Sequence, residues 1–329
     1  MSTTAPVTRS TAGRPLRPAQ HPSTLPGPSG PSTTPQPTIL SQSAPPAPQS
    51  RPSVRAAWYW ENRKSPNRWY WIAVTILCSL GSLSGYLQYR SYRSQFEAQG
   101  ATWEITWSQS TLLLSMLFLP LALGAFAAQI ASSEHQGRNW QRMSATGLET
   151  TMVAGKLLHG LQVAVLTTAV LVLTTAVTGL ASGFSLVGLV AFLPRFAVVA
   201  LGMWVILTFV TWLGAVMTSF ATTMSTVLLS IIAGMAMLLV ARPLSVLNPA
   251  ASLTRTTSAM SPGYVTSLGA AAFEGVICLV WVVLLTLALR RAVRRRSGAT
   301  VPQRPPRHTS PGSRGPSWTG WLSGGAPAP

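Results

Sequence analysis

Six long apolar runs, separated by polar segments, set the pattern of this chain. Each run approaches or exceeds the roughly 18 residues expected of a membrane-spanning helix. The predicted spans are about 69–87, 110–130, 158–180, 196–218, 223–240 and 266–289. The pattern therefore predicts an all-α, polytopic membrane protein with six transmembrane helices.

The polar segments divide between two faces of the membrane. Residues 88–108 and 241–266 are expected to be loops on one face, and the loop 131–157 lies on the other face with both termini. Aromatic and basic residues alternate in 57–71, which is typical of a segment at the headgroup level. A piece at 184–193, between the third and fourth spans, is expected to be interfacial or re-entrant.

The chain divides into three regions by composition. Residues 1–56 are rich in Pro, Ser and Thr, and residues 291–329 form a basic tail rich in Pro, Gly and Ser. Such sequences bury too little apolar surface to offset the entropy of ordering, so both tails are predicted to be disordered. The six-helix domain occupies 57–290. Within it, Pro120 is expected to kink the second span, which neighbouring membrane helices tolerate.

Charge supports the membrane assignment and predicts an orientation. Charged residues make up only 9% of the chain, and the net charge is +18. Most of the excess lies in the tails and beside the spans, which favours the lipid bilayer over nucleic acid as the partner. The face that carries the tails and the loop 131–157 is richer in Lys and Arg. We therefore expect that face, with both termini, to be cytoplasmic in the plasma membrane.

Several kinds of chemistry are disfavoured by what the sequence contains. All six acidic residues are Glu, which argues against an Asp-held magnesium ion. Gly155-Lys156 lacks a Gly five residues earlier and is followed by Leu157, so it is not a phosphate-binding loop. Cys78 and Cys278 lie in apolar runs and are expected to be buried thiols, and the histidines lack metal-ligand spacing. Neither an enzyme nor a metal site is predicted.

The cytoplasmic loop is the strongest candidate for a working contact. Glu134, Arg138 and Arg142 follow one another at helical spacing, and Trp140 and Met143 give an apolar side. A short amphipathic helix of this kind suits insertion into a groove of a soluble partner. The alternative is a plain solvated helix face.

Glu274 is the one carboxylate predicted to lie within a span, about two turns from its start. An intramembrane carboxylate suggests a functional site. The alternative is that the span begins later and Glu274 lies at the water interface.

The loop 131–157 resembles that of type-2 ABC transporter permeases, of the subgroup found in lantibiotic- and bacitracin-immunity exporters. The matching segments are Glu134-His135, Asn139-Trp140 and Ala154-Gly155-Lys156-Leu157. Glu61 and Lys64 belong to a segment similar to the amphipathic one that precedes the family's first span. The turn from Met143 to Gly147 departs from the family's pattern, because its Pro and Arg are missing. The resemblance covers about 57–290 and excludes the tails.

The resemblance implies the permease subunit of an ATP-driven exporter. A separate ABC ATPase subunit would bind ATP and magnesium, and this chain would bind no cofactor. A second permease subunit, identical or different, would complete the membrane pathway. The substrate would be hydrophobic or amphipathic, such as a peptide antibiotic. The residues implied to couple the loop to the ATPase are Glu134, His135, Arg138, Asn139, Trp140, Met143 and Lys156. We expect Glu134 and Trp140 to contact the ATPase directly. The alternative function is a non-transporting membrane sensor or scaffold that uses its long tails.

Overall fold

The computed structural model describes residues 52–298, except 65–66, 99–102, 138, 141 and 143–146. Almost all of the two predicted tails lies outside the described residues. Where the structure does describe the ends, it shows helix: the first helix begins at Val54, and the last continues to Gly298. The last helix therefore extends past residue 290 into the first residues of the predicted C-terminal tail.

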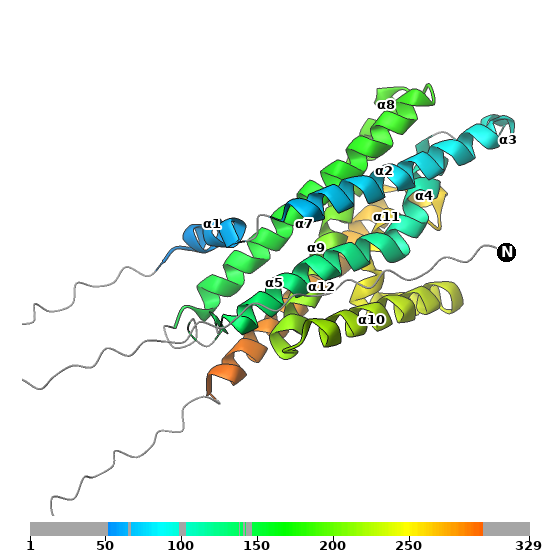
Figure 1. Ribbon diagram of the computed structural model, residues 1–329. Helices are drawn as coiled ribbons and strands as arrows, with labels where there is room; N and C mark the ends of the chain where they lie inside the picture. The colour runs from blue at the N-terminus through cyan, green and yellow to red at the C-terminus, as the bar shows by residue number, and fades with distance from the viewer. Residues whose placement is uncertain are drawn as a thin grey trace, which may run out of the picture. The chain divides into compact units, whose positions relative to one another are not determined.

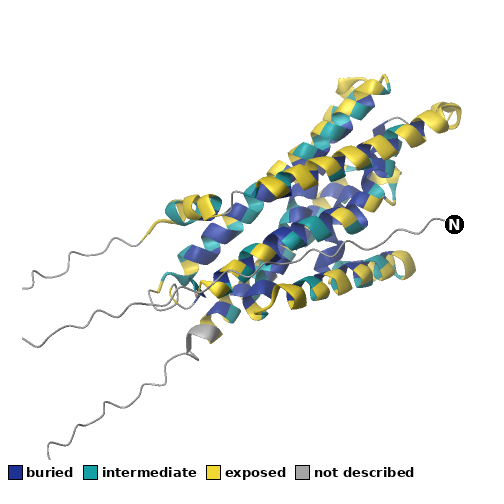
Figure 2. Cartoon of the chain, viewed as in Figure 1, coloured by how far each residue is buried: buried dark blue, intermediate teal, exposed yellow. Residues whose placement is uncertain are grey.

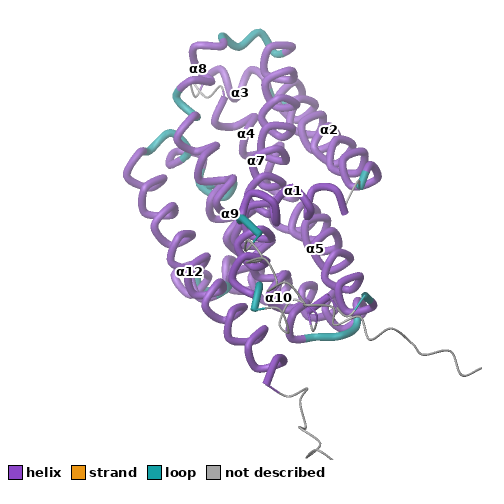
Figure 3. The backbone as a smooth tube through the Cα atoms, turned by 90° about the vertical axis from the view of Figure 1, so that its left-hand side faces the viewer, coloured by secondary structure: helices purple, strands orange, loops and turns teal. Residues whose placement is uncertain are grey.

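The described part of the chain consists of helices and loops, without a strand (Figure 3). The longer helices are α1 (Val54–Lys64), α2 (Arg68–Ser91), α4 (Trp103–Leu113), α5 (Leu119–Gln136), α7 (Glu149–Ala181), α9 (Leu193–Val216), α10 (Phe220–Val240) and α12 (Leu268–Gly298). The shorter elements are α3 (Arg93–Ala98), η1 (Leu114–Phe118), α8 (Leu186–Val190), η2 (Arg242–Leu247), η3 (Pro249–Ala251), α11 (Ser252–Thr257) and η4 (Pro262–Tyr264). Within the described residues, six helical segments are long and apolar enough to cross a membrane, with α4, η1 and α5 forming one of them. The predicted all-α fold and its six spans are confirmed (Figure 1).

Helix α9 is the most deeply buried of the six spans (Figure 2). Its sequence is apolar on all sides, as expected of a helix surrounded by other protein. It packs against α5, α7, α11 and α12. By contrast, α2, α10 and α12 each leave one apolar face exposed, which suits contact with lipid. The core of the molecule is therefore organised around α9.

The second span changes its winding before Pro120. The Leu119 amide donates to the Leu114 carbonyl, so η1 is a single π-helical turn. A proline cannot supply the amide that a regular helix requires, and π-turns are a known place for helices to change direction. The structure thus shows a local irregularity at the predicted position.

Two segments predicted to be loops contain helix instead. Within 88–108, α2 runs on to Ser91, α3 follows, and α4 begins at Trp103. Much of α4 is buried against the rest of the protein, which explains the error. Trp107 Nε1 donates to the Thr257 carbonyl at 2.8 Å, and Thr111 Oγ1 donates to the Trp107 carbonyl of its own helix at 2.7 Å. The segment 241–266 likewise forms η2, η3, α11 and η4, and much of it is buried.

The helices have two distinct ends. At one, His135 Nε2 at the end of α5 donates to the carbonyl of Gly214 at the end of α9, at 2.6 Å. At the other, Arg195 at the start of α9 donates to the backbone carbonyls of Thr256, Tyr264 and Val265. We call these the α1 end and the α11 end, because α1 packs on the first turns of α7 and α11 packs beside Arg195.

Candidate coupling site

Four charged side chains from three helices meet at the α1 end, and we call them the charge ring. Glu61 and Lys64 come from α1, Glu134 from the last turn of α5, and Lys156 from the third turn of α7. Lys156 Nζ lies 3.1 Å from Glu61 Oε2 and 3.0 Å from Glu134 Oε1. Lys64 Nζ lies 3.2 Å from Glu61 Oε1 and 3.3 Å from Glu134 Oε1. Each lysine therefore contacts both carboxylates.

Local sequence places α1 where it can supply two of these groups. Glu61 and Lys64 are three residues apart, so they lie on the same face of the helix. Gly155 lets α1 approach α7 closely, because a Cβ at Gly155 would lie 2.8 Å from the Ala57 Cβ. Trp58 Nε1 then donates to Gln162 Oε1 at 2.9 Å and fixes the same helix pair. The position of Glu61 follows from this packing.

The charge ring is mostly removed from water and is electrically balanced. Glu61 is 3% exposed, Glu134 1% and Lys156 8%. Lys64 lies at the edge, where burial lowers the pKa of its ammonium group but Glu61 and Glu134 raise that pKa by more, so it lies above the ordinary value. Two negative and two positive groups leave no net charge, so the cost of desolvating each ion is offset by its neighbours. Loss of any one member would leave a buried charge without compensation.

Trp140 connects the charge ring to the polar loop. Its indole is buried, and Lys156 Nζ lies 5.5 Å from the ring centroid, in reach of a cation–π contact. The same indole packs in a cluster with Met152, Val153, Ala215, Leu289 and Val293. These residues belong to α7, α9 and α12. A displacement of the loop would therefore change the packing against three transmembrane helices.

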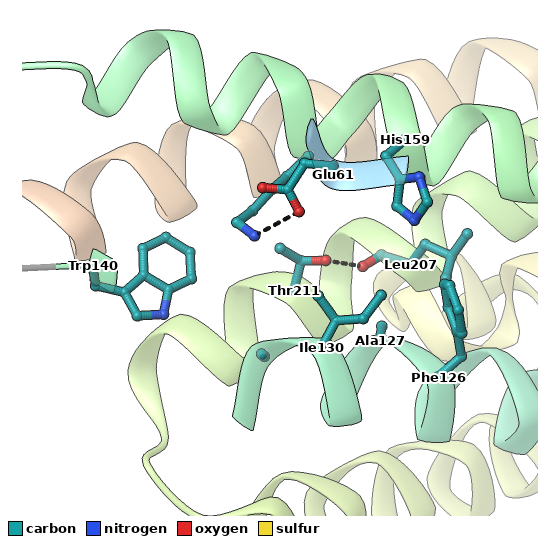
Figure 4. A pocket seen from close by; sticks show the side chains of 11 residues that line it. Glu61, Phe126, Ala127, Ile130, Trp140, His159, Leu207 and Thr211 are labelled. Carbon is teal, nitrogen blue, oxygen red and sulfur yellow. Dashed lines mark hydrogen bonds and ion pairs between the residues drawn. The ribbon is translucent and has the colours of Figure 1, made fainter. Parts of the chain in front are cut away.

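A cavity of about 30 Å³ lies beside the charge ring (Figure 4). Glu61, Trp140, His159 and Thr211 are among its lining residues. This volume is sufficient for a water molecule. Within the described structure, the two ring nitrogens of His159 and the indole nitrogen of Trp140 have no hydrogen-bond partner. The space beside the charge ring thus has polar nitrogens on one side, and a complete set of hydrogen bonds does not fix them in place.

The comparison with protein families decides the class of the molecule. The family described as ABC-2 family transporter protein matches residues 62–237, more than half of the chain. The matched region includes Lys64, Glu134, Trp140 and Lys156. The chain belongs to the ABC-2 transporter family. No match was found among curated proteins.

As an ABC-2 transporter protein, the chain is a membrane permease component. A permease-type component of this family carries no ATPase site of its own, and the family implies membrane embedding and an ABC ATPase as partner. The particular likeness to lantibiotic- and bacitracin-immunity exporters is not part of this match.

The permease brings some of the predicted site residues together and separates others. Glu134, Trp140 and Lys156 meet around the charge ring, although the first lies in α5 and the last in α7, so the loop proper is shorter than 131–157. His135 is bound to α9, Asn139 is half-buried and Arg142 is exposed. Arg138 and Met143 lie outside the described residues. Glu134 is 1% exposed and Trp140 5% exposed, and a direct contact of these residues with the ATPase stays a prediction.

Sequence reasoning did not include Glu61 and Lys64 among the site residues. Their spacing placed them on one helix face, but nothing local showed that this face would meet Glu134 and Lys156. Glu274 also has a partner that was not foreseen. It forms an ion pair with Arg255 of α11 and is 18% exposed at its side chain, so it is neither isolated in the hydrocarbon nor fully solvated.

Proposed function

We propose that this permease is the membrane subunit of an ATP-driven exporter, and that the charge ring transmits movement of the ATPase to the helices. The observation that carries this proposal is the position of Trp140 and Lys156. They join the polar loop to α1, α5, α7, α9 and α12 at one end of the molecule. Interfaces and packed cores respond to small shifts by changing between discrete arrangements. A push on the loop can in this way become a rearrangement of the spans.

The distribution of basic residues supports a cytoplasmic α1 end. The described basic residues beside the spans at this end are Arg63, Lys64, Arg68, Arg142, Lys156, Arg290, Arg291, Arg294, Arg295 and Arg296. Those at the α11 end are Arg90, Arg93, Arg195, Arg242 and Arg255. The richer end faces the cytoplasm by the positive-inside rule, which puts both termini of the described region there in the plasma membrane.

A groove between α1 and the start of α7 offers the ATPase a contact beside the loop. Its volume is about 370 Å³, and Trp60, Leu148 and Met152 are among its lining residues. Lys64 of the charge ring also lines it, so a group bound there would touch the edge of the ring. An apolar residue of the ATPase seated in this groove would bias the position of α1.

The transported substrate is hydrophobic or amphipathic, such as a peptide antibiotic, and a second permease subunit shares the pathway. Exposed apolar faces on α2, α10 and α12 are consistent with lipid or subunit contact. ATP and magnesium act on the ATPase, and the permease residues supply position and charge.

Purification of the permease from its native membrane, followed by identification of bound proteins, tests the proposal. An ABC ATPase is expected to co-purify, and inverted vesicles with the pair should accumulate a fluorescent amphipathic peptide when ATP is added. Trp140→Ala should abolish this accumulation at normal membrane abundance, because it removes the link between loop and helices. Glu97→Lys is the matched control, since Glu97 is an exposed residue at the α11 end. Accumulation by Trp140→Ala equal to that by Glu97→Lys would mean that Trp140 is not needed for coupling. Absence of a bound ATPase, with no accumulation by the unaltered permease, would favour a sensor or scaffold.

A further inference from the structure

A second cavity lies at the α11 end, far from the charge ring along α9. Its volume is about 370 Å³. The end of α10, η2, α11 and the start of α12 supply its walls, with Leu238, Arg242, Arg255, Met260, Phe273 and Glu274 among the lining residues. Pockets of roughly 300–1,000 Å³ are typical of sites for small ligands. The cavity is therefore of a size that a ligand headgroup could fill.

The charged groups in this cavity favour an anion. Glu274 is already paired with Arg255, whose side chain is only 6% exposed. Arg242 is exposed and has no ion-pair partner within the described residues. Two arginines and one glutamate give the lining one net positive charge. Arg195 adds a further positive charge nearby, since it is buried and bonded to backbone carbonyls, among them that of the lining residue Tyr264.

Apolar side chains continue from the cavity onto the outer surface of the helices. Leu238 and Phe273 line the cavity, and Val240, Leu244 and Leu247 are exposed beside it on α10 and η2. In a membrane protein, such surfaces at the ends of spans contact acyl chains. Arginine at the same depth suits a phosphate, because its planar guanidinium can donate two parallel hydrogen bonds to it. Polar and apolar surfaces are thus arranged as an amphiphile would require.

We propose that this cavity binds the phosphate headgroup of an anionic amphiphile, with Arg242 as its main contact and the chain lying against Leu238 and Phe273. Glu274 holds Arg255 in place and limits the positive charge of the site. The inference is independent of transport, because it rests on the charges and surfaces of the α11 end alone. The amphiphile can be a phospholipid of the bilayer or a free single-chain molecule.

Binding of radiolabelled dodecyl phosphate to the full-length permease in maltoside micelles tests this site. Arg242→Gln should weaken binding about tenfold, the loss expected for one charge-assisted hydrogen bond. Glu274→Gln should strengthen binding severalfold, because it releases Arg255 and removes a negative charge. Arg90→Gln is the matched control, since Arg90 is an exposed arginine of α2 at the α11 end of the molecule. Arg242→Lys, which keeps the charge, should recover part of the affinity.

Competition identifies the source of the amphiphile. Displacement of dodecyl phosphate by phosphatidylglycerol, and not by phosphatidylcholine, would assign the site to a bilayer lipid. Displacement by neither lipid, with the Arg242→Gln effect intact, would assign it to a free amphiphile. Wild-type affinity in Arg242→Gln would overturn the proposal. Equal weakening of binding by Glu274→Gln and by Arg242→Gln would also overturn the proposal, because a merely structural role of the two residues predicts a loss of binding from both changes.

Discussion

At the scale of single residues, the charge ring is the feature with the greatest energetic consequence. Glu61, Glu134 and Lys156 are almost fully buried, and Lys156 Nζ lies 3.1 Å from Glu61 and 3.0 Å from Glu134. Buried ion pairs contribute little net stability over apolar residues, but breaking one is costly. This asymmetry suits a site whose geometry must be fixed and yet able to change as a unit.

We expect Lys156→Met to lower the free energy of unfolding by about 3–5 kcal/mol, because it leaves two buried carboxylates facing one partly exposed lysine. The double variant Lys156→Met with Glu134→Gln restores the balance of charge. The double variant should lose at least about 1 kcal/mol less free energy of unfolding than the sum of the losses in the two single variants, as is typical of residues in contact. Unfolding in mixed micelles with increasing SDS, followed by tryptophan fluorescence, measures both quantities.

The exposed ion pair between Arg93 and Glu97 provides the control for this cycle. Both side chains are more than half exposed, so solvent screens their attraction. Arg93→Gln should leave the unfolding curve unchanged. Strictly additive losses in the Lys156 and Glu134 cycle would mean that the two residues do not act through a shared contact.

At the scale of elements, α1 depends on one close approach to α7. The Cα of Gly155 faces the Ala57 backbone, and there is no flexible side chain between them that could move aside. The two helices can stay in contact only while position 155 has no side chain. Because α1 supplies two members of the charge ring, its docking decides whether the ring forms.

We expect Gly155→Val to detach α1 from α7. A cross-link between Trp58→Cys and Gln162→Cys by a short bifunctional maleimide reports on the contact, since the two native side chains are hydrogen-bonded, in a background where Cys78 and Cys278 are replaced. The cross-link should form readily in the parent and fail in Gly155→Val. Gly160→Ala is the control, because its new methyl group would lie at an ordinary 3.7 Å from Trp204. Equal cross-link yield in both variants would contradict the close-approach argument.

At the scale of the whole molecule, the two proposed functional regions lie at opposite ends of α9. The charge ring and its loop occupy the α1 end, and the anion-favouring cavity occupies the α11 end. Helix α9, the most deeply buried span, runs from one end to the other. This arrangement gives the proposed orientation a direct test.

Single cysteines introduced at exposed positions should report the orientation, in a background without the two native cysteines. Ser94→Cys and Gly263→Cys lie at the α11 end and should react with a membrane-impermeant maleimide added to intact cells. Thr150→Cys, exposed at the start of α7, should react only after the cells are opened. Labelling of Thr150→Cys alone in intact cells would reverse the orientation.

The spans and the helical fold could be predicted from the sequence, because a transmembrane helix depends on properties of a continuous segment. Length and apolar content suffice, since every backbone group of such a helix is satisfied within the segment itself. The ends of the spans were harder to place. Trp107 of α4 lies in a segment polar enough to suggest a loop, but its indole N–H donates to a carbonyl 150 residues away in sequence.

The candidate site was only partly contained in the sequence. Glu134, Trp140 and Lys156 could be singled out by a resemblance, yet the direction in which they point could not. Lys156 and Glu61 lie 95 residues apart, and they meet because Gly155 allows α1 to pack on α7. In the same way, the cavity around Arg242 and Glu274 exists because α10, α11 and α12 enclose it. The sequence by itself determined six membrane helices, and the packing of those helices decided which charges are buried together.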